Sequence, residues 1–104
     1  MADSVRIHER FYNIESYKKQ EIRDLVEKNL DKKMSSYLKS IKNKKDAEIV
    51  LDYKIERNKR NKYDAKFLLS LDGQLYVYSP KVPFKFSDDV VNHAFDHFKL
   101  TLAG

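Results

Sequence analysis

A dense group of cationic side chains occupies residues 56–63, which read Glu-Arg-Asn-Lys-Arg-Asn-Lys-Tyr, and it offers the chemistry of phosphate binding. Arg57, Lys59, Arg60 and Lys62 lie close together, and guanidinium and ammonium groups pair well with phosphate oxygens. A solvated end of a hairpin is the alternative interpretation, because many charged turns serve only solubility. The elements that flank this segment must decide between the two.

The flanking residues alternate between apolar and polar side chains, which is the period of a half-buried strand. The apolar members are Ile49, Leu51, Tyr53 and Ile55 before the cations, and Ala65, Phe67 and Leu69 after them. We therefore predict two strands, over residues 47–56 and 63–71, that present the cations at the end of a hairpin. An earlier strand is predicted near residues 5–11, with Arg6 and Arg10 on its basic face.

Two helices are predicted from apolar residues that recur every three or four positions. The first helix follows Ser16 and is expected to run unbroken for about six turns, because no Pro or Gly interrupts it. Its outer face carries Arg23, Lys28 and Lys32, and a Lys39–Lys45 run adds to the positive field. The second helix follows Ser87. Both serines are predicted to act as N-caps. The apolar stripe of the first helix comprises Ile22, Leu25, Val26, Leu30, Met34, Tyr37, Leu38 and Ile41. The apolar stripe of the second helix comprises Val90, Val91, Ala94, Phe95, Phe98 and Leu102.

The Asp72-Gly73 pair predicts a tight hairpin before a fourth strand, and the length of the turn decides which face the next side chains occupy. A two-residue turn places Tyr76 and Tyr78 on the core face. A three-residue loop with a bulge places Leu75 and Val77 there instead. We favour the bulge, which would leave the two tyrosines on the open face, available to stack on bases.

These elements predict an α+β fold of order β-α-β-β-β-α in a single domain that spans residues 1–104. Each helix has one apolar stripe, and the sheet offers one apolar face. The expected architecture is therefore a two-layer sandwich, in which a four-stranded sheet carries both helices on one face. The connection through a helix allows the first strand to pair parallel to a later strand. We expect strands two to four to form an antiparallel meander.

Composition narrows the classes of function. The net charge of +5 and a pI near 9.3 favour a polyanionic partner. The chain has no Cys and only two Gly, so a thiol nucleophile is excluded and no glycine-rich phosphate loop is present; we expect no enzyme activity, cofactor or small-molecule substrate.

His93 and His97 have metal-chelating spacing near Asp89, but a helix-surface pair is favoured. No apolar run is long enough to span a membrane and none resembles a signal peptide, so the cytoplasm is expected.

Three stretches resemble the ribosome hibernation-promoting factors, also called ribosome-associated inhibitors or protein Y. Residues 22–30, Ile-Arg-Asp-Leu-Val-Glu-Lys-Asn-Leu, resemble that family's first helix. Residues 54–65 resemble its basic hairpin and the strand that follows. Residues 90–102 resemble its closing helix, with Asp96 in register. The specificity lies in the combination and in the element order, and the chain resembles a short form or the N-terminal domain of a longer protein.

The resemblance implies a translation inhibitor that binds the small ribosomal subunit and its RNA near the decoding region, blocks tRNA and mRNA binding, and acts during stress and in stationary phase. We expect Arg57, Lys59, Arg60 and Lys62 to contact phosphates. Arg23, Lys28 and Lys32 would extend this surface along the helix, and Arg6 and Arg10 would contribute from the open sheet face. A general double-stranded RNA-binding module and a protein-protein interaction domain remain as alternatives.

Overall fold

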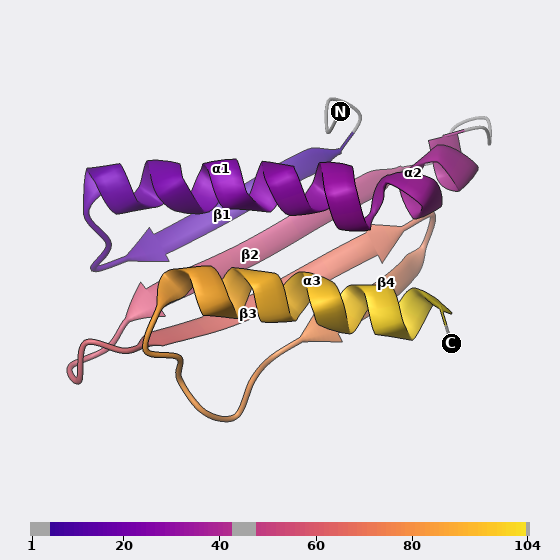
Figure 1. Cartoon of the computed structure of the whole chain (residues 1–104). Coiled ribbons are helices and arrows are strands. Elements are labelled where there is room, and N and C mark those ends of the chain that lie inside the picture. Colours follow the sequence, from indigo (N-terminus) through magenta and orange to yellow (C-terminus); the bar gives the residue numbers. More distant parts are fainter. Residues whose placement is uncertain (1–4, 43–47, 104) are drawn as a thin grey trace.

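The computed structural model describes residues 5–42 and 48–103, with side chains for residues 5–39 and 48–103. It contains one four-stranded mixed sheet in the order β1-β2-β3-β4, with the helices packed on one face (Figure 1). β1 pairs parallel to β2, and the other neighbours pair antiparallel, so the predicted α+β sandwich is confirmed. The strands are β1 (Arg6–Tyr12), β2 (Ile49–Arg57), β3 (Tyr63–Leu71) and β4 (Gln74–Tyr78).

The first predicted helix is in fact two helices, α1 (Ser16–Lys33) and α2 (Ser35–Lys42). The break falls at Met34, whose backbone leaves regular helical geometry at φ −107° and ψ −4°. The Ser35-Ser36 pair follows directly, and serine pairs are a recognised cause of helix kinks. The prediction of one unbroken helix was wrong, although the apolar stripe continues into the core through Met34 and Leu38. Ile41 and most of the Lys39–Lys45 run lie outside the described side chains.

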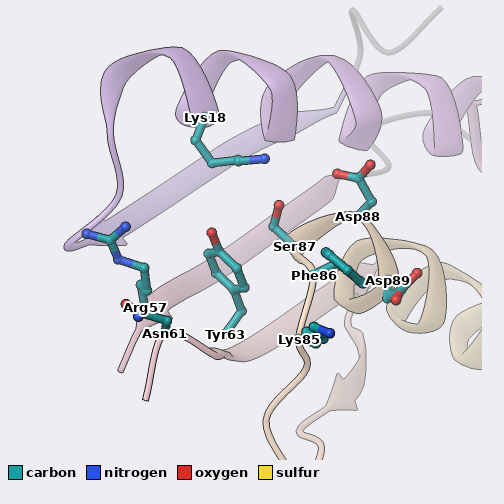
Figure 2. A pocket seen from close by; sticks show the side chains of 9 residues that line it. All are labelled: Lys18, Arg57, Asn61, Tyr63, Lys85, Phe86, Ser87, Asp88 and Asp89. Carbon is teal, nitrogen blue, oxygen red and sulfur yellow. The ribbon is translucent and has the colours of Figure 1, made fainter. Parts of the chain in front are cut away.

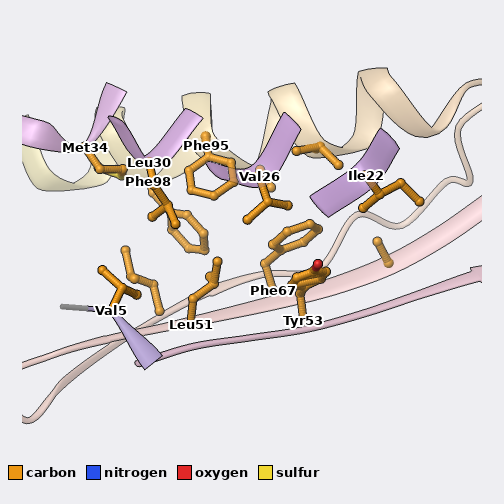
Figure 3. Packing of buried hydrophobic residues seen from close by; sticks show 14 of the residues in the cluster. Val5, Ile22, Val26, Leu30, Met34, Leu51, Tyr53, Phe67, Phe95 and Phe98 are labelled. Atoms are coloured by element: carbon orange, nitrogen blue, oxygen red, sulfur yellow. The ribbon is translucent and has the colours of Figure 1, made fainter. Parts of the chain in front are cut away.

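The core fills the space between the sheet and α1 and α3 (Ser87–Ala103). Tyr53 and Phe67 stack with ring centroids 5.2 Å apart, and Phe95 meets Phe67 edge to face at 6.1 Å (Figure 3). α1 and α3 lie side by side, joined by a hydrogen bond from Asn29 Nδ2 to Asn92 Oδ1 at 3.1 Å. Large buried aromatic side chains dominate the energetics of such a core. No helix of the described residues covers the other face of the sheet (Figure 1).

The turn between β3 and β4 has two residues, so the predicted bulge was wrong. Asp72 and Gly73 both have positive φ, 49° and 89°, which is the geometry of a tight type I′ hairpin. The register pairs Leu69 with Tyr76 and Phe67 with Tyr78, so both tyrosines lie on the core face. Leu75 and Val77 consequently lie on the open face.

The predicted serine caps were also wrong. Ser16 and Ser87 are the first residues of their helices rather than the residues before them. The N-cap of α1 is Glu15, whose side chain forms no capping hydrogen bond. Residues 79–86, which contain Pro80 and Pro83, form no strand, and within this segment only Phe84 makes an isolated bridge, to Tyr63.

Candidate nucleic-acid interface

The tip of the β2-β3 hairpin is held in one shape by Asn58. Its backbone N–H donates to the carbonyl of Lys62 at 2.8 Å. Its side-chain Oδ1 accepts from the backbone N–H groups of Arg60 at 2.9 Å and Lys62 at 3.2 Å. Asn61 occupies the left-handed region with φ 59°, a conformation that asparagine tolerates well. The loop that carries the predicted phosphate contacts is therefore preorganised.

Three cations at this tip are exposed and have no carboxylate partner among the residues that the structure describes. Within the part of the chain that the structure describes, no acidic side chain forms an ion pair with Lys59, Arg60 or Lys62. Arg57 differs, because its guanidinium lies 3.7 Å from the carboxylate of Glu15 and its side chain is 37% exposed. The tip thus presents three available positive charges, with a fourth that is already partly neutralised.

Two cations of the open sheet face lie opposite each other, separated from the tip by the opposed acidic pair Glu56 and Asp64. Lys54 of β2 is directly opposite Lys66 of β3, and on its other side Lys54 is in register with Arg10 of β1. Like charges directly opposite each other destabilise a sheet. Lys54 and Lys66 form no ion pair with a described residue, so these two charges remain available to an external anion, whereas Arg10 is paired with Asp52.

The remaining predicted cations do not share one surface with the hairpin. Arg6 and Arg10 lie on the open face and pair with Glu48 at 3.3 Å and with Asp52 at 3.2 Å. Lys28 and Lys32 are exposed on α1, in the helix layer on the opposite side of the sheet. The nine predicted residues are therefore divided among the hairpin tip, the open face and the helix layer.

Arg23 belongs to a network that the sequence analysis missed. Its Nε lies 2.5 Å from Glu9 Oε1, and Tyr53 donates its hydroxyl to the other oxygen of Glu9 at 2.8 Å. The guanidinium also lies 5.4 Å from the ring centroid of Phe11. Burial raises the pKa of Tyr53 far above its ordinary value, and the hydrogen bond to Glu9 raises it further. Glu9 occupies a core-facing position of β1 between Ile7 and Phe11, and that acidic residue in an apolar series was the available signal.

Tyr76 and Tyr78 are not positioned to stack on bases from the open face. Tyr78 packs against Phe67 with ring centroids 6.5 Å apart and against His97 at 5.3 Å, and its burial raises its pKa. Tyr76 packs against the same core. The base-stacking hypothesis for these two residues is not supported by their location.

The two histidines of α3 make packing contacts. His93 lies against Phe84, with ring centroids 5.0 Å apart, and His97 Nε2 lies 3.1 Å from the carbonyl oxygen of Val77. Among the described residues, no three His, Cys, Asp or Glu side chains gather in a way that would hold a metal ion. A search of the same residues finds no helix with the length and apolarity needed to cross a membrane.

Comparison with known proteins identifies a solved structure that has the same fold. No protein-family model matches the sequence, and no curated protein sequence matches it. The structure is similar to the crystal structure of the N-terminal domain of protein Y from Thermus thermophilus, with a TM-score of 0.63 and 20% sequence identity. The match covers 92% of this chain and 93% of that domain. The chain therefore has the fold of the protein Y N-terminal domain over almost its whole length.

Proposed function

We propose that this protein is a ribosome-associated translation inhibitor that binds small-subunit ribosomal RNA near the decoding region and blocks tRNA and mRNA binding. One observation carries the proposal: a preorganised hairpin presents Lys59, Arg60 and Lys62, all exposed, on a fold that matches a protein Y N-terminal domain. Folded RNA is recognised mainly through its shape and its backbone phosphates. A rigid group of unpaired cations is suited to that kind of recognition.

The contacts are proposed to begin at the hairpin tip, where Arg57 joins the three free cations once RNA competes with Glu15. Lys54, Lys66, Arg6 and Arg10 would extend the contact over the open face of the sheet. Lys28, Lys32 and Arg23 lie in the helix layer and would contact RNA only where it passes around the molecule. The hairpin therefore ranks first among the proposed RNA-binding residues.

Co-sedimentation with purified small and large ribosomal subunits tests the proposal. We expect the protein to sediment with the small subunit at low salt and to be displaced by tRNA and mRNA. Three to four phosphate contacts predict that the logarithm of affinity falls by about three for each tenfold increase in salt. A protein that remains in the supernatant at low salt contradicts the proposal. Equal binding to naked RNA duplex indicates a general double-stranded RNA-binding module instead.

One observation favours a second function, a protein-interaction domain. Leu75 and Val77 are 62% and 44% exposed on the open face of β4, which is an edge strand. An exposed edge strand can add a strand from a partner protein. If this function is correct, the chain binds a partner protein and does not bind RNA. That binding should be insensitive to salt and should be lost in the Leu75→Lys variant.

A further inference from the structure

A pocket of about 380 Å³ lies where the start of α1, the hairpin and the start of α3 meet (Figure 2). Lys18, Arg57 and Tyr63 line it from α1 and the hairpin, and Phe86 and Ser87 line it from the start of α3. Two backbone hydrogen bonds between Tyr63 and Phe84, at 2.7 and 2.9 Å, fix the loop before α3 against β3. The pocket therefore has fixed walls from distant parts of the sequence, and its volume falls in the range of small-molecule sites.

Ser87 supplies a buried polar group without a partner. It is only 2% exposed, and its Oγ forms no hydrogen bond with any described residue. Figure 2 shows its hydroxyl directed toward the space between Lys18 and Tyr63. Ser87 is also the first residue of α3, where backbone N–H groups have no partner within the helix and attract negative charge. A buried hydroxyl left unpaired is costly, so a ligand that bonds to it would remove that cost.

The charges in this pocket are mixed. Lys18, Arg57 and Lys85 bring positive charge, while Asp88 and Asp89 bring negative charge beside the same helix terminus. Lys18 and Arg57 also have outer partners, Glu21 at 3.0 Å and Glu15 at 3.7 Å, respectively.

The pKa of Lys18 is raised mainly by its hydrogen bond to Glu21, with smaller contributions from the nearby Tyr63 and Asp88. Lys18 therefore also interacts with groups that line the pocket. A bare phosphate ion would meet two carboxylates here. A ligand that combines an anionic group with hydrogen-bond donors fits better.

An exposed aromatic ring lies at the mouth of the pocket. Phe86 is 58% exposed, and Lys85 Nζ lies 5.5 Å from its ring centroid. An exposed ring beside cations is the arrangement on which nucleic-acid bases stack. The ligand is thus expected to carry a planar ring as well as an anion.

We propose that this pocket binds one ribonucleotide. The phosphate accepts hydrogen bonds from the Ser87 hydroxyl and the first N–H groups of α3, and it pairs with Lys18 and Arg57. The base stacks on Phe86, and the ribose hydroxyls donate to Asp88. A free nucleotide and a single nucleotide of an RNA strand share this chemistry. The inference goes beyond the proposed function, because it concerns the isolated chain and holds whether or not the protein binds ribosomes.

Titration of the isotope-labelled protein with ribonucleoside monophosphates, followed by NMR, tests this site. We expect shifts at the amides of Lys18, Ser87 and Asp88, and binding about tenfold tighter than for inorganic phosphate, because of base stacking. The 2′-deoxy analogues are expected to bind more weakly, since they lack the hydroxyl that distinguishes RNA from DNA. Shifts confined to other surfaces, or equal binding of inorganic phosphate, would overturn the proposal.

Two variants and one control make the test sharper. Ser87→Ala is expected to weaken nucleotide binding about tenfold through the lost hydrogen bond to a charged group. It removes an unpaired group, so it should fold. Phe86→Ala is expected to weaken binding about tenfold through lost stacking. Lys99→Ala, on the exposed side of α3, is the matched control and should bind normally. Normal binding by both pocket variants would contradict the proposal.

The source of the nucleotide and the independence of the two proposals can be tested together. A trinucleotide blocked at both ends that binds more tightly than the monophosphates indicates a residue of an RNA strand, and weaker binding indicates a free nucleotide. Both results support the pocket.

The triple variant Lys59→Ala, Arg60→Ala and Lys62→Ala should keep nucleotide binding even where it loses ribosome binding, so failure of one proposal is distinguishable from failure of the other.

Discussion

The hairpin tip and the β1 region, which comprises β1 and the neighbouring Arg23 of α1, both concentrate positive charge. They differ in whether those charges are paired with carboxylates. At β1, the guanidinium groups of Arg6, Arg10 and Arg23 each contact a carboxylate. At the tip, Lys59 and Arg60 are exposed and form no ion pair with a described residue. The difference shows that the number of cations in a segment does not give the charge available to a partner.

The cause of the difference lies in the sheet. β1 lies beside β2, and the parallel register brings acidic residues of β2 and of the segment before it within reach of the arginines of β1. The hairpin tip extends past the end of β1, where Glu15 reaches only Arg57. Exposed ion pairs such as that of Arg6 contribute little stability, because both groups are well solvated. Their main effect is to neutralise charge.

Removal of the free charges should have the largest effect. The triple variant Lys59→Ala, Arg60→Ala and Lys62→Ala is expected to bind small subunits on the order of fiftyfold more weakly at about 0.2 M salt, because three phosphate contacts are lost. The slope of the logarithm of affinity against the logarithm of salt concentration should also become shallower, by the amount that corresponds to three phosphate contacts. Sedimentation across a salt series measures both. The double variant Arg6→Ala and Arg10→Ala is the comparison and should lose less affinity, because both arginines are already paired with carboxylates. An equal loss in that variant would remove the distinction between the two regions.

Glu9→Gln tests the paired region. The substitution leaves Arg23 without its carboxylate and weakens the acceptor for Tyr53, so the free energy of unfolding should fall by about 2 kcal/mol. This value is less than for a fully buried pair, because the side chain of Arg23 is 43% exposed. Urea denaturation measures the change. Glu48→Gln, which breaks only the surface pair with Arg6, should change stability by less than about 0.5 kcal/mol. Equal effects of the two substitutions would contradict this assignment.

The same network predicts a loss of stability at high pH. Burial and the bond to Glu9 raise the pKa of Tyr53 in the folded state, so the unfolded chain ionises first. The contribution of Tyr53 is complete below pH 10 and is lost as the pH rises beyond it, at about 1.4 kcal/mol per pH unit. Unfolding free energies at about pH 9 and pH 11 measure the slope. Tyr53→Phe should show a shallower slope, and an unchanged slope would exclude Tyr53 as the cause.

The smallest effect concerns the shape of the tip. Asn58→Ala removes the side-chain acceptor for two backbone N–H groups but leaves every cation in place. Stability should fall by about 1 kcal/mol, and ribosome affinity should fall a few fold, because the cations lose their fixed spacing. Asn61→Gly suits the positive φ at that position and is the control. Unchanged affinity in Asn58→Ala would show that charge alone determines binding.

Local patterns predicted most of the fold. The alternation around Tyr53 and Phe67 marked the core face of β2 and β3, and both residues are fully buried. The helical spacing from Ile22 to Leu38 likewise marked a continuous apolar stripe. Features that depend on one residue's geometry were missed. The helix breaks at Met34, and the two-residue turn at Asp72 and Gly73 reverses which side chains of β4 face the core.

The candidate sites were predictable only in part for the same reason. The cationic hairpin was visible in the sequence, since neighbouring residues in a turn stay together in any fold. The ion pair of Arg23 with Glu9, and the pocket that Lys18 and Ser87 both line, bring together residues that are far apart along the chain. No local pattern encodes such contacts.

The amino-acid sequence by itself determined where the strands and helices lie, which stripes are apolar, and that the hairpin is cationic, because each of these follows from neighbouring residues. Only the tertiary structure decided which cations remain free, since that depends on the carboxylates that strand register and helix packing bring beside them. It also decided that Ser87, Lys18 and Phe86 surround one pocket, because long-range packing alone brings α1, the hairpin and α3 together.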